Sequence, residues 1–169
     1  YSQFCELYRS FGYDRKDTEE LLENPDNTIV FARDVTTGDV VSSAMAEHAS
    51  IEIAGMGELS IVEITEAITL PDQRGRGLYR VVSGLLTDEL VDQSKNGESP
   101  IHAIYGESNL AAVGVLRAAY QNGRRFSAFD GQELGIDSPR FGILPQNFSV
   151  QDGIEQRPYN DFAVSYVPL

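Results

Sequence analysis

The sequence predicts a single α+β domain over residues 1–169, with a mixed, mostly antiparallel sheet flanked by helices on both faces. Two short helical segments come first, an antiparallel hairpin follows, and the remainder alternates strand, helix, strand, helix, strand. A chain of 169 residues that is 41% hydrophobic is long enough for one core and too short for two independent ones. This order of elements is typical of an α+β protein.

The first elements are two helices and a hairpin. Asp17–Leu22 resembles a short capped helix, which Pro25 ends. β-Branched and aromatic residues over 28–33 predict a strand, residues 37–39 a turn, and residues 40–46 the returning strand. The first helix is predicted from apolar residues spaced by three and four, namely Phe4, Leu7, Tyr8 and Phe11.

A long extended segment rich in Ile, Val and Thr runs from Glu58 to Leu70 and ends at Pro71. A helical stripe of apolar residues follows from Leu78 to Val91. The remaining elements are a strand at 101–105, a helix at 110–120 that Asn122-Gly123 closes, and a last strand at 162–167.

The chain is strongly acidic, with 26 Asp and Glu against 13 Lys and Arg and a formal net charge of −13. Such a field disfavours a nucleic-acid partner. Lys16 and Lys95 are the lysines, so most basic residues are arginines. Acidic, lysine-poor surfaces are similar to those of proteins from salt-loving organisms, and we expect a halophilic protein.

Several other kinds of site and location are disfavoured. Cys5 has no cysteine to pair with, and His48 and His102 have no companion at ligand spacing, so neither a disulfide nor a metal site is expected. No apolar run is long enough to cross a bilayer, and the start lacks a signal-peptide pattern. We therefore expect a cytoplasmic protein without a membrane partner. The missing initiating Met leads us to expect that the chain was cut from a longer one.

The turn Arg74-Gly75-Arg76-Gly77-Leu78-Tyr79 connects the long strand to the next helix. Glycines there remove side chains, so that backbone N–H groups at the positive end of the helix can face an anion. Arg74 and Arg76 add positive charge. The turn lacks both the Gly-Lys-Ser/Thr of a P-loop and the three glycines of a dinucleotide fingerprint. The simpler interpretation is a tight strand-to-helix connection.

The segment from Val62 to Leu78 resembles the signature of the GNAT superfamily of N-acetyltransferases, in which a central strand enters an Arg/Gln-x-x-Gly-x-Gly/Ala loop. Tyr79 stands where Gly or Ala is usual. The resemblance covers about 28–125 and implies the GNAT fold. The lead-in Thr69-Leu70-Pro71 and the closing Tyr166–Leu169 also look somewhat like the β-lysine acetyltransferases.

The resemblance implies acetyl-CoA as the cofactor. Backbone groups of Ala67, Ile68 and Thr69 would pair with its pantetheine arm. Asn109 would hydrogen-bond the same arm, although a plain helix N-cap explains this residue equally well. The diphosphate would be held by Arg74, Gly75, Arg76, Gly77, Leu78 and Tyr79.

Acetyl transfer to an amine needs a base and a proton for the leaving thiolate. Glu63 occupies the strand position at which several GNAT members carry the base, and alternation places it on one face with Thr69. Glu66 lies on the other face unless a bulge re-aims it. Tyr120 is the candidate general acid, although it stands one residue beyond the usual position. Tyr105, at the end of the short strand, is the alternative.

These observations predict direct transfer of an acetyl group from acetyl-CoA to a primary amine of a small molecule, in an enzyme of the acyltransferase class. The acidic surface favours a cationic amine. A longer acyl-CoA donor, or a non-catalytic domain that senses acyl-CoA, remain open alternatives. A homodimer is the default expectation for such a domain.

Overall fold

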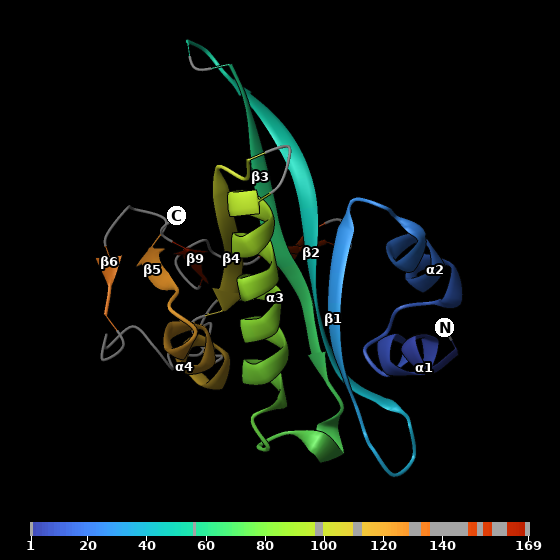
Figure 1. Ribbon diagram of the computed structural model, residues 1–169. Coiled ribbons are helices and arrows are strands. Elements are labelled where there is room, and N and C mark those ends of the chain that lie inside the picture. The colour runs from blue at the N-terminus through green and yellow to red at the C-terminus, as the bar shows by residue number, and fades with distance from the viewer. Residues whose placement is uncertain are drawn as a thin grey trace. The chain divides into compact units, whose positions relative to one another are not determined.

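The computed structural model describes residues 2–55, 57–96, 100–109, 113–128, 133–135, 149–151, 154–156 and 162–167. The chain divides into two compact units, with the boundary between Ile104 and Tyr105. The first unit holds the long strands and the glycine turn. Its elements are α1 (Ser2–Arg9), α2 (Arg15–Glu23), β1 (Asn27–Arg33), β2 (Val40–Ile53), β3 (Gly57–Thr69), the 3-10 helix η1 (Pro71–Gln73) and α3 (Leu78–Asn96) (Figure 1).

Helix α2 begins two residues before the predicted start because its cap is Asp14. The Asp14 carboxylate accepts the N–H of Asp17 at 2.8 Å, and the Asp17 carboxylate accepts the N–H of Asp14 at 3.4 Å. This reciprocal capping box satisfies two N–H groups that the first turn leaves without helical partners. Asp17, predicted near the start, is therefore the third residue of the helix.

Strand β2 continues seven residues beyond the predicted end at Ala46, to Ile53. It forms a long antiparallel hairpin with β3, with Ile53 opposite Gly57 at the tip. Polar residues such as Glu47 and His48 interrupt the apolar pattern there, but pairing along the whole of β3 supplies the backbone hydrogen bonds. Strand β1 pairs antiparallel with the other edge of β2, which confirms the predicted first hairpin.

The register between β2 and β3 changes once, close to the end of β3. Ser43 lies opposite Ile68 and Met45 lies opposite Thr65. One residue of β2, Ala44, therefore faces two residues of β3, which is a β-bulge. Bulges change the direction of the side chains that follow them, and only Ile68 and Thr69 follow this one in the strand.

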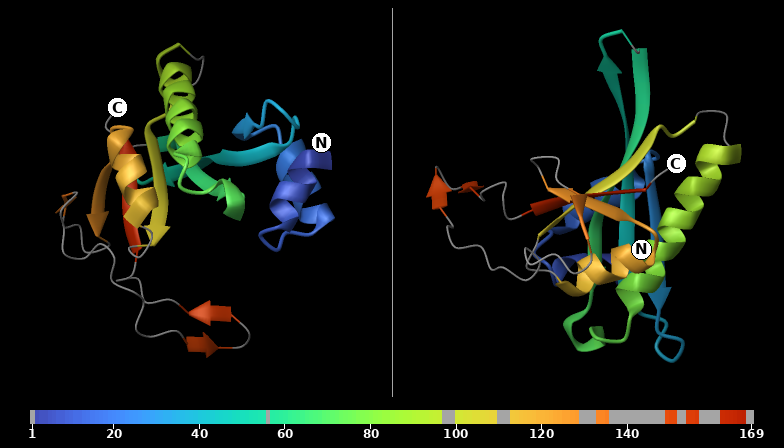
Figure 2. Two further views of the ribbon diagram at one scale, coloured as in Figure 1. Left: turned by 90° about the horizontal axis from the view of Figure 1, so that it is seen from below. Right: turned by 90° about the vertical axis from the view of Figure 1, so that its left-hand side faces the viewer.

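Helices cover both faces of this part of the sheet. Seven consecutive residues of β2, from Val40 to Ala46, are buried, although successive side chains of a strand point to opposite faces. Figure 2 shows α3 on one side of β1, β2 and β3 and the two N-terminal helices on the other. One core cluster joins α1 to the strands through Phe4, Leu7, Tyr8, Val40 and Ile68.

The second unit begins within β4 (Ala103–Asn109) and is built around α4 (Val113–Gln121). Strand β5 (Arg125–Ala128) pairs antiparallel with β6 (Glu133–Leu134) on one side and with β9 (Phe162–Val167) on the other. Strands β7 (Ser149–Gln151) and β8 (Ile154–Gln156) form a separate antiparallel pair. Leu116, Ala119 and Phe126 are its fully buried apolar side chains among those described.

The predicted fold class is confirmed as α+β with mostly antiparallel strand pairing. The last strand has the predicted bounds, whereas β4 begins two residues later than predicted and continues to Asn109. Helix α4 starts no later than Val113, and residues 110–112 of the predicted helix lie outside the described part. No described helix is both long and apolar enough to span a membrane.

Candidate active site

The glycine turn has the backbone that its two glycines allow. Gly75 and Gly77 have φ angles of 78° and 77°, in the left-handed region that side chains disfavour. The turn follows η1 and leads directly into α3, whose first helical residue is Leu78. Two positive φ angles within three residues reverse the chain tightly, so that the helix N-terminus lies beside the turn.

The space around the turn is open. A Cβ atom built on Gly75 or Gly77 would meet no atom within 4 Å beyond its two chain neighbours, and both glycines are exposed. The first N–H groups of an α-helix have no partner within the helix and carry its positive dipole end. The turn therefore places these N–H groups beside two exposed glycines whose Cβ side is open.

The two arginines of the turn have different surroundings. Arg74 donates its Nε–H to the carbonyl oxygen of Thr69 at 3.2 Å. Arg76 donates a terminal N–H to the side-chain carbonyl of Gln73, and its charge contributes to lowering the pKa of Asp34 in the β1–β2 turn. Both arginines are exposed, so their charges add to the positive end of α3.

Tyr79 and Leu78 occupy the first two positions of α3 and are half-buried. In the family pattern the position of Tyr79 belongs to Gly or Ala, so a larger side chain stands beside the turn here. The turn retains its open side, because the two glycines remain exposed on it.

The bulge of β3 consists of Glu66 and Ala67, so it includes the first of the three predicted coenzyme-pairing residues. It corrects one prediction, because Thr69 does not share a face with Glu63. The extra residue reverses the alternation, and Thr69 instead pairs with Ser42, with 2.8 Å between their hydroxyl oxygens.

The three predicted coenzyme-pairing residues differ in exposure. Ala67 is exposed, Ile68 is buried in the core beneath α1, and Thr69 is half-buried. Their carbonyls are partly used within the protein, because Ser42 Oγ donates to Ile68 at 3.0 Å and Arg74 donates to Thr69. The exposed backbone at Ala67 is therefore the accessible point of this strand end.

Glu63 is half-buried in β3 and lies directly opposite Glu47 of β2, so both side chains are on the face that α1 and α2 cover. The side chain of Glu66 lies outside the described part. The predicted possibility of a bulge at Glu66 is confirmed by the register.

Two hydroxyls on the face of Glu63 were not predicted from the sequence. Ser43 Oγ and Thr65 Oγ1 are buried and have no hydrogen-bond partner among the described residues. Most buried polar atoms in folded proteins are paired, so these two hydroxyls are exceptions among the described residues. In the sequence they are a serine and a threonine at buried positions of two strands. Such residues are too common to predict unpaired hydroxyls.

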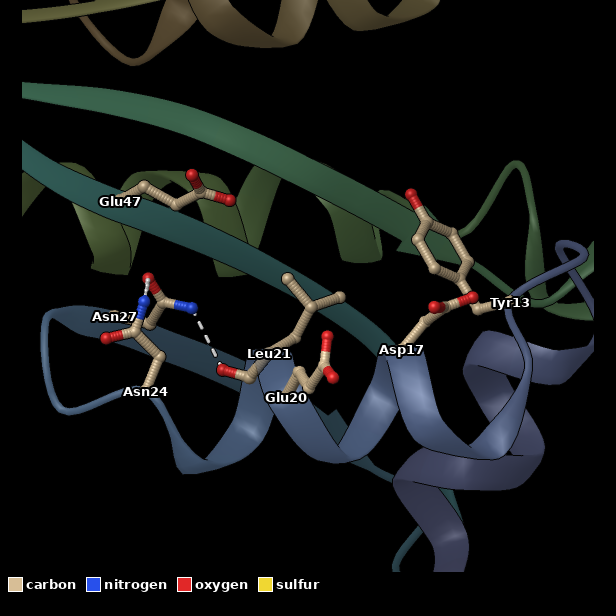
Figure 3. Close-up of a pocket in the computed structure, with 7 residues that line it drawn as sticks. All are labelled: Tyr13, Asp17, Glu20, Leu21, Asn24, Asn27 and Glu47. Atoms are coloured by element: carbon tan, nitrogen blue, oxygen red, sulfur yellow. Dashed lines mark hydrogen bonds between the residues drawn. The ribbon is translucent and has the colours of Figure 1, made fainter.

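An acidic depression of about 380 Å³ lies between α2, the loop that follows it and β2 (Figure 3). Three of its lining side chains are carboxylates, and none is basic. Glu20 is paired with Lys16 at 3.1 Å, and this pairing raises the Lys16 pKa above its usual value. The lining residues are Tyr13, Asp17, Glu20, Leu21, Asn24, Asn27 and Glu47.

The remaining predicted site residues belong to the second unit. Tyr120 is 44% exposed on α4, whereas its neighbour Ala119, at the usual family position, is buried. Tyr105 is the third residue of β4 rather than its last. Asn109 is the last residue of β4, and its side chain and residues 110–112 lie outside the described part, so the N-cap interpretation is untested. The roles of these residues stay predictions.

The elements and their order define the acetyltransferase fold of the GNAT superfamily, as comparison with solved structures shows. The structure of Arabidopsis thaliana NAA60 in complex with a bisubstrate analogue matches with a TM-score of 0.59 and 13% identity, over 98% of this chain and 91% of that one. NAA60 in complex with acetyl-CoA matches with a TM-score of 0.58 and 12% identity, over 98% and 90% of the two chains.

A putative acetyltransferase from Agrobacterium tumefaciens matches with a TM-score of 0.54 and 17% identity, over 72% of this chain and 84% of that one. No protein-family model matches the chain, and no curated protein matches it. The fold that the sequence resemblance implied is therefore confirmed by structure, at identities too low to carry more than the fold.

Proposed function

We propose that this protein is an N-acetyltransferase that transfers an acetyl group directly from acetyl-CoA to a primary amine of a small molecule. The observation that carries the proposal is the open glycine turn at the N-terminus of α3, which directly follows the bulged end of β3. A structural neighbour, NAA60, was solved with acetyl-CoA. In the proposed complex, amides from Gly75 to Tyr79 bind the diphosphate, and the backbone at Ala67–Thr69 and Asn109 contact the pantetheine arm.

The chemistry assigned to the site is direct transfer. The amine nitrogen attacks the thioester carbonyl carbon, the C–S bond breaks, and the coenzyme leaves as a thiolate that takes up a proton. Glu63, with Glu66 as the alternative, is the proposed base that removes the amine proton. Tyr120 is the proposed acid, with Tyr105 in reserve.

The acidic depression supports a cationic acceptor. An amine in water is protonated at neutral pH, and carboxylates attract and retain such cations. Glu47 joins the two features, because it lines the depression and lies opposite Glu63 in the sheet. An amine bound between α2 and the sheet would thus meet the proposed base on the same face.

The first test is ligand-induced stabilisation. A ligand at free concentration L that binds only the folded state stabilises it by RT ln(1 + L/Kd), so the melting temperature rises with the logarithm of the ligand concentration once that exceeds Kd. Acetyl-CoA, a long-chain acyl-CoA, free CoA and pantetheine are compared at equal concentration. Stabilisation by the three CoA species and not by pantetheine is expected, and no stabilisation by any of them would refute the coenzyme site.

The second test is release of free thiol with a panel of amines. We expect Glu63→Gln to reduce kcat about 100-fold, within the range of general-base catalysis, without changing stabilisation by CoA. An unchanged kcat would reject Glu63 as the base. Coenzyme binding without thiol release for any amine would instead support the non-catalytic alternative, which Tyr79 in the place of a small residue favours.

A further inference from the structure

Phe11 is a large apolar side chain on the surface, in the connection between α1 and α2, where it is 37% exposed. Its position is fixed by the backbone, because its N–H donates to Tyr8 at 2.9 Å and the next residue, Gly12, donates to Arg9 at 3.1 Å. The Phe11 ring lies beneath the guanidinium of Arg74, whose central carbon is 5.7 Å from the ring centroid. This distance is within the range of a cation–π interaction.

Arg74 has a second anchor in the end of β3. Its Nε–H donates to the Thr69 carbonyl, and the Thr69 hydroxyl is hydrogen-bonded to Ser42, which is fully buried. The guanidinium is therefore held at its face by Phe11 and at Nε by a residue tied to the core. Its terminal Nη groups make no hydrogen bond to any residue in the described part of the chain.

Arg76 differs in this respect. One of its Nη groups donates to Gln73, and the neighbouring charge of Asp34 attracts it. Of the two arginines of the glycine turn, Arg74 thus has both its orientation fixed and its terminal donors available. A guanidinium with free terminal N–H groups is a bidentate donor that matches a phosphate.

We propose that Phe11 is a positioning residue for coenzyme binding: its ring and the Thr69 carbonyl hold Arg74 with its terminal N–H groups directed to the phosphates of the coenzyme. The inference rests on the proposed function. An exposed arginine side chain otherwise loses much conformational freedom when it binds an anion, and preorganisation reduces that loss. The segment between α1 and α2 thereby contributes to the coenzyme side of the site through a residue that does not touch the coenzyme.

The test is a double-mutant cycle on the Kd for CoA. Phe11→Leu is expected to raise the Kd about two- to fivefold, as for an exposed cation–π contact, and Phe11→Tyr is expected to retain the wild-type Kd. In an Arg74→Ala background, Phe11→Leu is expected to have no further effect. With acetyl-CoA as the varied substrate, KM rises while kcat is unchanged.

Phe31 provides the matched control. It is 42% exposed and lies under Arg33, with 5.4 Å from the guanidinium carbon to the ring centroid, so Phe31→Leu removes a similar pair that contains no arginine of the glycine turn. It is expected to leave the Kd for CoA unchanged. Melting temperatures report whether each variant is folded.

The outcomes separate the two proposals. The role of Phe11 is overturned if the wild type binds CoA and Phe11→Leu has the same Kd. It is also overturned if Phe11→Leu loses the same CoA affinity in the wild-type and Arg74→Ala backgrounds. Either result leaves the proposed function intact. A wild-type protein that does not bind CoA overturns both.

Discussion

Glu63 of β3 lies directly opposite Glu47 of β2, on the face of the sheet that α1 and α2 cover. Like charges directly opposite each other in a sheet destabilise the pair. Both side chains are half-buried, so water screens the repulsion only partly. A cationic acceptor bound between them would relieve it, and this arrangement therefore relates the proposed base to substrate selection.

Glu47→Gln tests this relationship because it keeps the shape and removes the charge. We expect KM to rise about tenfold for a diamine, consistent with the loss of one charge-assisted contact, and to rise less for a monoamine, with kcat nearly unchanged. The measurement is steady-state thiol release with the two amines at saturating acetyl-CoA.

The pairing of β2 with β3 also offers a matched control for Glu47→Gln. Glu52 lies opposite Glu58 near the tip of the hairpin, and both are exposed. Glu52→Gln also removes one charge of a facing pair, so it is expected to leave both KM values unchanged. Equal effects at Glu47 and Glu52 would show that only the net charge of the protein matters.

Gly75→Ala is expected to weaken coenzyme binding through the backbone alone. At φ 78° an alanine costs about 1–2 kcal/mol, while its Cβ would meet no other residue within 4 Å. The turn would relax from this conformation and its amides would diverge. Isothermal titration with CoA should show a Kd at least fivefold higher.

Gly55 separates binding from stability in this experiment. It lies in the β2–β3 turn with φ 84° and equally open space, so Gly55→Ala imposes a similar strain elsewhere. Both variants should lose similar unfolding free energy, and only Gly75→Ala should lose CoA affinity. A normal Kd in Gly75→Ala would remove the glycine turn from the coenzyme site.

Asp34 makes the stability of the β1–β2 turn depend on pH. The N–H groups of Thr36 and Thr37 donate to its carboxylate at 2.8 and 3.1 Å and lower its pKa, and the charge of Arg76 lowers it further. A carboxyl whose pKa is depressed by folding stabilises the protein above its unfolded pKa of about 3.9, and this contribution is lost as the pH falls through the folded value.

We therefore expect wild type to exceed Asp34→Asn in unfolding free energy at pH 6, and the difference to shrink below about pH 4. Denaturant titrations between pH 6 and pH 2.5 measure it. Asp39→Asn, in the same turn, is the control, because no described residue donates a hydrogen bond to the Asp39 carboxylate. A difference that stays constant with pH would contradict the linkage.

The parts of the fold and site that depend on local sequence could be predicted. The glycine turn is one, because positive φ angles and a following helix are specified by adjacent residues. The start of α2 was misplaced because Asp14 and Asp17 can each act as a cap, and their reciprocal pairing decides between them.

Features that depend on strand register could not be predicted. The bulge at Glu66 and Ala67 arises because Ser43 pairs with Ile68 whereas Met45 pairs with Thr65, three residues earlier. Nothing in the sequence of either strand alone specifies this pairing. The change of face at Thr69 and the orphaned hydroxyls follow from the same register. The acidic depression likewise requires α2 to pack beside Glu47, a contact between residues distant in sequence.

Ser42 and Ser43 offer a final test, because adjacent serines of β2 are both fully buried and differ in their partners. Ser42 Oγ is hydrogen-bonded to Ile68 and Thr69, whereas Ser43 Oγ has no partner among the described residues. Removing a bonded hydroxyl costs about 1–3 kcal/mol when its partners stay buried, whereas removing an orphaned one relieves a desolvation penalty. Ser42→Ala should therefore destabilise the protein, and Ser43→Ala should stabilise it.

If the Ser43 hydroxyl is retained for function, the stabilised Ser43→Ala variant should also be slower. We expect about a tenfold loss of kcat with an unchanged Kd for CoA, since stability is commonly exchanged for activity at functional positions. Denaturant unfolding and thiol release on the same preparations measure both quantities. A Ser43→Ala variant that is more stable and fully active would assign the orphaned hydroxyl to neither folding nor catalysis.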